Sequence, residues 1–167
     1  MLKSTGVVRK IDDLGRIVIP KEIRKVLKIE NSDDLEIFVE NDTIILKKYS
    51  VMLNNQDTSN KLISSVDDLI DASIFITDKE KVITSGELEN KLLNNKLKDL
   101  IFNRQSYKSN TSETIKFAEK DKTGFFIIKP IIQNSDANGL IIICKDSKIT
   151  SEDMLFASIL KNIIEKA

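Results

Sequence analysis

Four basic residues in the run PKEIRKVLK have the spacing that gathers side chains on one face of a helix. Residues at i, i+3, i+4 and i+7 lie on the same side of an α-helix. That spacing is shared by Lys21, Arg24, Lys25 and Lys28. Like charges this close repel by roughly 0.2–0.5 kcal/mol per pair, and Glu22 lies to one side and relieves little. The spacing therefore predicts a surface that binds a polyanion.

More positive charge precedes this helix, at Arg9, Lys10 and Arg16. Residues 1–28 contain eight basic and three acidic side chains, a net charge of +5, whereas residues 29–50 contain two basic and six acidic, a net charge of −4. The whole chain has 26 of each and a formal net charge of zero. The prediction of nucleic-acid binding thus depends on local charge. The plain alternative is a basic helical face that is merely solvated.

Composition argues against several other classes of protein. Cys144 is the one cysteine among 167 residues and there is no histidine, so an intramolecular disulfide, an ordinary zinc site and histidine acid–base chemistry lack their residues. The chain contains no P-loop, dinucleotide fingerprint or nucleophile–base pair. We therefore expect no enzyme, no metal and no cofactor. No apolar stretch has the length of a signal peptide or a membrane span, so we expect a cytoplasmic protein without a membrane partner.

The first 52 residues alternate between strand and helix patterns. Period-two alternation predicts strands at 7–12 and 16–19, with a tight turn at Asp13–Gly15. Pro20 suits the first position of a helix that we expect to run to Lys28, and strands at 35–40 and 43–48 form a hairpin. The strands are apolar on both faces, and a unit of this size buries only about 60% of its unfolded surface. A second copy of the chain would cover both faces, so we predict an intertwined dimer.

This segment resembles a known family. STGVVRKIDDLGRIVIPKEIRKVLKI and DDLEIFVENDTIILKKYS, within residues 3–50, are similar to the AbrB-like swapped-hairpin DNA-binding domains. The resemblance implies an interleaved homodimeric β-barrel with one short helix per chain, which reads A/T-rich double-stranded DNA through shape and flexibility. The DNA-contacting arginines of the family fall on Arg9, Arg16 and Arg24. The next one falls on Lys25, and lysine lacks the planar fork of arginine.

A polar segment at 53–60 predicts a linker to a second domain at 61–167, and the segment is compatible with a linker that runs directly into a helix. There we expect helices at 61–72, 88–102 and 151–166, a hairpin at 73–77 and 82–84, and strands at 114–118, 124–132 and 139–145. GFFIIKPIIQNSDANGLIIICK resembles the late strands of GAF domains. The resemblance implies an α+β domain with an antiparallel sheet flanked by helices. Cys144 and the strand phenylalanines are interpreted as core, and they are Phe75, Phe117, Phe125 and Phe126.

The last helix has a wider apolar band than one contact requires. We therefore expect the first and last helices of this domain to pack against another copy and to join two dimers into a tetramer. The order of the two domains resembles a family of sporulation transcription regulators. The resemblance implies a nucleoid-associated bacterial protein that activates or represses promoters in the forespore. The sequence leaves open a small-molecule effector of the GAF-like domain. The alternative is an antitoxin-like protein whose C-terminal domain binds a protein partner.

Overall fold

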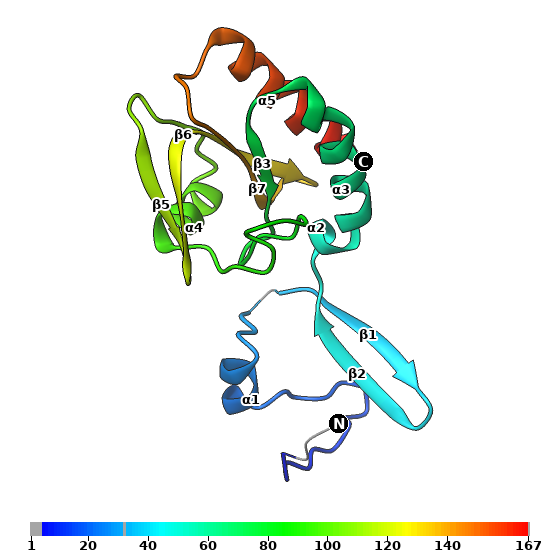
Figure 1. The fold of residues 1–167 in the computed structure, drawn as a ribbon. Coiled ribbons are helices and arrows are strands. Elements are labelled where there is room, and N and C mark those ends of the chain that lie inside the picture. Colours follow the sequence, from blue (N-terminus) through cyan, green and yellow to red (C-terminus); the bar gives the residue numbers. More distant parts are fainter. Residues whose placement is uncertain (1–4, 32, 167) are drawn as a thin grey trace. The chain divides into compact units, whose positions relative to one another are not determined.

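The computed structural model describes residues 5–31 and 33–166 (Figure 1). The chain divides into two compact units, Met1–Tyr49 (unit 1) and Ser50–Ala167 (unit 2). The segment predicted as a linker, 53–60, is instead part of unit 2, where α2 (Val51–Asn54) and α3 (Gln56–Val66) cover it except at Asn55. The Ser50 side chain caps α2 by accepting a hydrogen bond from the Leu53 N–H at 3.2 Å, and such capping starts a helix at the beginning of this polar segment.

Unit 1 contains one short helix and one hairpin. Helix α1 (Lys21–Val26) follows Pro20, and strands β1 (Leu35–Glu40) and β2 (Thr43–Lys48) pair antiparallel, with Glu40 opposite Thr43. Asn41 has a φ of +51° in the turn between them, a left-handed conformation that asparagine tolerates. The hairpin predicted from the sequence is confirmed.

The two strands predicted at 7–12 and 16–19 do not form, since residues 5–31 as described contain no strand. Their apolar side chains face solvent, with Val8 86% and Val18 73% exposed. A strand needs a partner edge to satisfy its backbone groups. Within one chain these segments reach each other only near the turn, where the Asp12 N–H donates to the Arg16 carbonyl at 3.1 Å.

Helix α1 is shorter than predicted because the chain turns out of it at Lys28. This residue has a φ of +52°. The Lys28 N–H donates to the Lys25 carbonyl at 3.3 Å, and the Ile29 N–H donates to the Arg24 carbonyl at 2.8 Å. These are the two hydrogen bonds of the Schellman motif, in which the left-handed position usually belongs to glycine. A lysine at that position concealed the end of the helix from sequence reasoning.

Unit 2 is built on an antiparallel sheet with helices on both faces (Figure 1). The strands are β3 (Ser73–Ile76), β4 (Tyr107–Lys108), β5 (Glu113–Phe117), β6 (Lys120–Gln133) and β7 (Asp136–Lys145), in the order β3-β7-β6-β4, and β5 also pairs with β6. The helical elements are α2, α3, η1 (Asp67–Leu69), α4 (Asn95–Phe102) and α5 (Ser151–Lys166). An antiparallel α+β domain, as expected, is what the chain forms here.

Successive side chains of β7 point to opposite faces of the sheet, so the core of unit 2 forms two clusters. Leu140, Ile142 and Cys144 pack with α4 on one face of the sheet. Ile141 and Ile143 pack with α5 on the other face. A central strand that is covered on both faces reads as a continuous apolar run, which is why Leu140–Cys144 shows no polar alternation. Burial raises the pKa of the Cys144 thiol to about 11, so the thiol is protonated at neutral pH and behaves as a small core side chain.

Several elements of unit 2 differ from their predicted bounds. Helix α4 begins at Asn95 and not at residue 88 as predicted. Residues 87–90 form a turn in which Leu88 is buried, and Leu92 and Leu93 form isolated β-bridges. Strands β6 and β7 run further than predicted and meet at Asn134 and Ser135, both with positive φ. Positive φ at both central residues is the requirement of a tight two-residue hairpin turn, and sequence reasoning missed this turn. It also missed the two-residue strand β4.

Gly139 lies where β7 approaches the end of β3 most closely. A Cβ added there would stand 1.8 Å from the Thr77 carbonyl oxygen. The two backbones cannot separate without loss, because the Thr77 N–H donates a hydrogen bond to the Leu140 carbonyl at 2.9 Å. We expect Gly139→Ala to lower the free energy of unfolding by about 3 kcal/mol or more, because the backbones must separate. Urea unfolding measures it. Gly86→Ala shows the cost of backbone strain without a clash, because a Cβ there meets nothing within 4 Å but Gly86 has a φ of +126°. Equal losses in both variants would contradict the clash.

Helix α5 begins with a reciprocal cap. The Asp153 N–H donates to Thr150 Oγ1 at 3.2 Å, and the Thr150 N–H donates to Asp153 Oδ2 at 2.8 Å, as the spacing of the two residues predicts. Lys145 Nζ donates to both Asp153 oxygens, at 2.9 and 2.8 Å. Burial opposes ionisation of this carboxyl, but the hydrogen bonds from Lys145 and Thr150 outweigh burial and lower the pKa of Asp153 below 3.8.

The lowered pKa makes the contribution of Asp153 dependent on pH. A carboxyl whose folded pKa lies below its unfolded value stabilises the protein above that value and loses this effect as the pH falls through the folded pKa. We expect Asp153→Asn to lower the free energy of unfolding by about 1–2 kcal/mol at about pH 6. The difference from the unmodified chain should shrink as the pH falls below the ordinary pKa of an aspartate and through the lower folded pKa of Asp153. Thermal unfolding across this range measures it, and a difference independent of pH would contradict the role of the charge.

Candidate nucleic-acid interface

The turn at 12–16 presents Arg16 at the surface of unit 1. Gly15 has a φ of +76°, and its N–H donates to the Asp12 carbonyl at 2.9 Å. The Arg16 side chain is 71% exposed, and its Nε donates to Asp12 Oδ2 at 2.7 Å. Hydrogen bonds from the Arg16 backbone and side chain lower the pKa of Asp12. The guanidinium is therefore held at its Nε edge, and its terminal amino groups have no hydrogen bond in the described part of the chain.

Helix α1 gathers three of the four cations of the predicted stripe. Lys21 and Lys25 are exposed. Arg24 is half-buried, its Nη1 donates to Asn31 Oδ1 at 2.9 Å, and its Nε is buried without a partner in the described part of the chain. Lys28 is exposed but lies in the turn after the helix, so the predicted four-residue helical stripe is corrected to three residues on α1 and one beyond it.

Arg9 and Lys10 lie outside the helix, in the extended segment before the turn. Both are exposed. The cations predicted as DNA contacts thus occupy three consecutive parts of unit 1: the segment 5–12, the turn at 12–16, and α1 with the turn that follows it. The acidic side chains of unit 1 concentrate instead on residues 29–50. This separation along the chain makes residues 5–28 the cationic part of unit 1, called its cationic end below.

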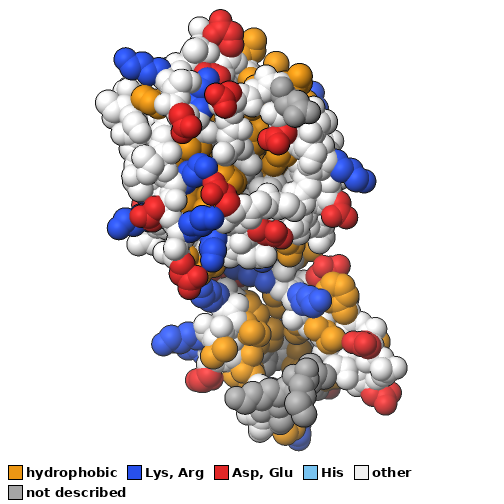
Figure 2. Space-filling model, viewed as in Figure 1, with side chains coloured by type: hydrophobic (Ala, Val, Ile, Leu, Met, Phe, Trp, Pro, Cys, Tyr) orange, Lys and Arg blue, Asp and Glu red, His pale blue; other side chains and the backbone are white. Residues whose placement is uncertain are grey.

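Apolar side chains share the surface of unit 1 with these charges. Figure 2 shows hydrophobic side chains in the part of unit 1 between α1 and the β1–β2 hairpin. The exposed set includes Ile11, Leu14, Ile17, Val26, Leu27, Ile37, Val39 and Ile44. So many exposed large apolar side chains on one small unit are typical of a surface that another chain covers.

Sequence reasoning missed two partners of the candidate arginines. Asp12 bonds Arg16, and Asn31 bonds Arg24. The signal for the first is the pattern D-D-L-G-R, because an aspartate before a glycine turn commonly accepts backbone N–H groups two residues and more ahead. The second had no local signal, since Asn31 follows the end of a helix that was predicted to extend to Lys28.

Two family models match the chain. Residues 8–52 match "Antidote-toxin recognition MazE, bacterial antitoxin", and residues 54–162 match "Stage V sporulation protein T C-terminal, transcription factor". Stage V sporulation protein T of Bacillus subtilis (strain 168) is 33% identical over 160 residues, which is 90% of this chain and 89% of that protein. The chain belongs to the stage V sporulation protein T family.

Other similarities concern the N-terminal part alone. Transition state regulatory protein AbrB of Bacillus subtilis (strain 168) is 54% identical over 57 residues, 34% of this chain and 59% of that protein. The solution structure of the N-domain of the transcription factor AbrB is 58% identical, covers 30% of this chain and 96% of that one, and has a TM-score of 0.28. The AbrB-like and sporulation-family resemblances seen in the sequence are confirmed. Neither family model that matches describes an enzyme.

No helix among the described residues is long and apolar enough to cross a membrane.

Proposed function

We propose that this chain is a transcription regulator that binds A/T-rich promoter DNA through unit 1 and controls sporulation-stage genes. The observation that carries the proposal is the separation of charge within unit 1, with a net +5 over residues 1–28 against −4 over residues 29–50. Duplex DNA carries one negative charge per about 1.7 Å of its axis, so a surface of this kind gains affinity from each phosphate that it neutralises. The candidate contacts are Arg9, Lys10, Arg16, Lys21, Arg24, Lys25 and Lys28.

The proposal includes an interleaved dimer of unit 1. Its support is the set of apolar side chains on segments 7–12 and 16–19 that face solvent in the single chain, together with their missing strand partners. A second copy would supply strand edges and cover these side chains, forming the closed barrel that the resemblance implies. The dimer would also bring two cationic ends to one DNA duplex.

A second dimer contact is proposed for α5. The helix buries Ala157, Leu160 and Ile164 against its own sheet, while Leu155, Ile159 and Ile163 form an exposed row at i, i+4 and i+8. Next to that row lies a groove of about 300 Å³ between α3 and α5.

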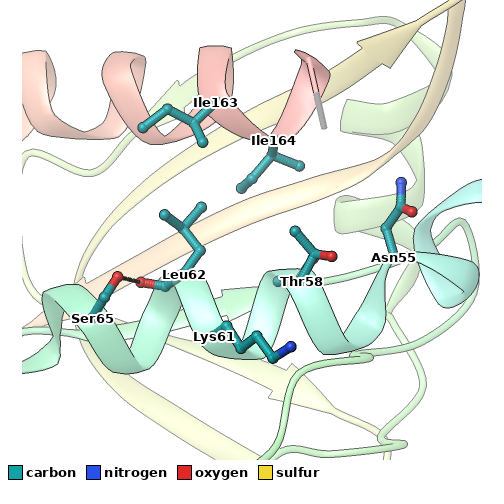
Figure 3. Close-up of a pocket in the computed structure, with 8 residues that line it drawn as sticks. Asn55, Thr58, Lys61, Leu62, Ser65, Ile163 and Ile164 are labelled. Atoms are coloured by element: carbon teal, nitrogen blue, oxygen red, sulfur yellow. Dashed lines mark hydrogen bonds between the residues drawn. The ribbon is translucent and has the colours of Figure 1, made fainter.

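In Figure 3, Thr58 and Leu62 point from α3 toward α5, and Ile163 and Ile164 lie opposite them. The lining is mostly apolar, so it suits another apolar helix better than a polar ligand. The proposed occupant is the same row of α5 from a second copy, because a helix packed about a two-fold axis presents a self-complementary surface. This contact would join two unit-1 dimers into a tetramer.

We propose that unit 2 is a GAF-like regulatory domain whose main role is this oligomerisation. Its aromatic side chains fill the core: Phe75, Phe117 and Phe126 are buried in the cluster that includes α4. They are therefore packing residues, and the proposal assigns them no effector. Phe125 is half-buried beside them.

The test of DNA binding uses the purified full chain and a fluorescent A/T-rich duplex. We expect Arg16→Ala and Arg24→Ala each to weaken binding at least about tenfold, since each removes a charged contact twice per dimer. Lys47→Ala is the matched control, because Lys47 lies over the Phe38 ring at 4.7 Å on the β1–β2 hairpin, on the acidic part of unit 1. An equal loss from all three variants would refute the assigned surface.

The antitoxin-like reading is the second candidate, and the match of residues 8–52 to an antitoxin family model favours it. Antitoxins of this kind usually end in a polar segment that folds on the toxin. Residues 50–166 instead contain two buried apolar clusters of their own, which supports the regulator over the antitoxin. Absence of DNA binding, with capture of a discrete protein partner by the full chain, would reverse that preference.

A further inference from the structure

Asp12 is an acidic residue in the middle of the most basic part of the chain. Residues 1–28 contain only three acidic side chains, of which Asp12 and Asp13 are adjacent. A carboxylate beside a surface that meets phosphates lowers affinity through repulsion. Charge alone therefore predicts that removing the carboxylate of Asp12 or of Asp13 tightens DNA binding. The two effects should be similar in size, because the residues are neighbours.

The contacts of the two residues differ sharply. Asp12 Oδ1 accepts hydrogen bonds from the Leu14 N–H at 3.0 Å and the Arg16 N–H at 2.8 Å, and Oδ2 accepts one from Arg16 Nε at 2.7 Å. Asp13 is exposed and its carboxylate has no partner in the described part of the chain. Asp12 thus joins the backbone of the turn and the guanidinium of Arg16 through one carboxylate.

The geometry of that guanidinium has a consequence for phosphate binding. Within the described residues, Nε is the one guanidinium nitrogen of Arg16 that has a hydrogen bond. The two terminal amino groups keep four N–H donors in the plane of the fork, which matches the spacing of two phosphate oxygens. Exposed ion pairs contribute little to folding stability, so the main effect of this pair is on where the Arg16 side chain points.

From these contacts we propose that Asp12 is a positioning residue for Arg16, which orders the guanidinium before DNA arrives so that its free amino edge meets a phosphate. The inference rests on the proposed function, because it assigns Arg16 to DNA. An ordered arginine loses less conformational freedom on binding than a mobile one. Asp12 therefore favours DNA binding although it carries the same sign of charge as DNA.

The experiment compares Asp12→Asn with Asp13→Asn in the full chain, against the same A/T-rich duplex at fixed salt. Asparagine at 12 keeps an acceptor for the two backbone N–H groups but loses the charged bond to Arg16 Nε. We expect Asp12→Asn to weaken binding about 3- to 10-fold. We expect Asp13→Asn, which makes the identical change of charge, to tighten it by up to about twofold.

A double-mutant cycle separates positioning from a general effect on the turn. In an Arg16→Ala background, Asp12→Asn should no longer weaken binding and should behave as Asp13→Asn does. A loss of affinity of the same size in both backgrounds would show that Asp12 acts on the fold of the turn. Tighter binding by Asp12→Asn in the unmodified background would show that charge repulsion dominates. Either result overturns the inference while leaving the proposed DNA binding intact.

A measurement on the free protein tests the ordering of Arg16 by Asp12 independently of DNA binding. In the free protein, the NMR order parameter of the Arg16 Nε–H bond should be high and should fall in Asp12→Asn, with Asp13→Asn unchanged. An equally mobile Arg16 side chain in all three proteins would overturn the inference. If the unmodified chain fails to bind the duplex at all, the proposed function fails, and the role of Asp12 in DNA binding falls with it.

Discussion

The affinity of this chain for an A/T-rich duplex is expected to fall about 10⁴-fold between 50 and 200 mM monovalent salt. A dimer that uses Arg9, Arg16, Arg24 and Lys25 makes eight phosphate contacts, and each contact lowers the slope of log K against log salt by about 0.9. The expected slope is therefore near −7. Its physical origin is the release of counterions from the DNA, which becomes less favourable as the bulk salt rises.

Variants test which side chains produce this slope. Arg16→Ala removes two contacts per dimer, so the slope should flatten by about 2 units, to near −5. Lys47→Ala should leave it unchanged, since Lys47 belongs to the hairpin on the acidic part of unit 1. Fluorescence anisotropy over a salt series gives both slopes. A shallow slope in the unmodified protein, near −1 or −2, would mean that the cationic end of unit 1 does not lie along DNA.

Loss of the tetramer is the second large effect that we expect. Ile159 is the middle residue of the exposed row on α5, between Leu155 and Ile163. A glutamate there would place a charge in an apolar contact where it has no partner, and the cost of burying an unpaired charge far exceeds the gain from a few aliphatic contacts. Ile159→Glu should therefore convert a tetramer into a dimer at micromolar concentration.

Sedimentation velocity measures this change directly, because each chain has a mass of 18.9 kDa. Phe102→Glu is the control, since Phe102 is also an exposed large apolar residue, 86% exposed against 48% for Ile159, and lies on a different helix of unit 2. It should leave the oligomeric state unchanged. Ile159→Glu should also keep its affinity for a single DNA site, because the proposed dimer of unit 1 does not use α5. A monomer in the unmodified protein would refute both oligomer contacts.

Local chemistry made some elements predictable from the sequence. The β1–β2 hairpin follows from two apolar strands around Asn41 and Asp42. Helix α5 follows from Thr150 and Asp153, whose reciprocal hydrogen bonds define its first turn. In both cases the interacting residues lie close together along the chain, so the local sequence is enough to predict the element.

Other features depended on neighbours distant in sequence. The helix predicted at 88–102 begins only at Asn95. Leu88 is buried among side chains from both β5 and β6, and it lies in a turn at residues 87–90. The end of α1 depended on Lys28 adopting a conformation that usually requires glycine. Its carbonyl accepts a hydrogen bond from Lys48 on β2 at 3.2 Å, a contact that local propensity cannot anticipate.

The sequence by itself determined where the charges of unit 1 lie along the chain and which residues could meet DNA, because these are properties of composition and order. The structure decided how those cations are held. The bond from Arg16 to Asp12 is local and has a signal in D-D-L-G-R, but sequence reasoning found no signal for the bond from Arg24 to Asn31 or for the position of Lys28 beyond the helix. The reason is that the residue type fixes the charge, whereas the direction in which the side chain points depends on hydrogen-bond partners that the fold brings within 3 Å.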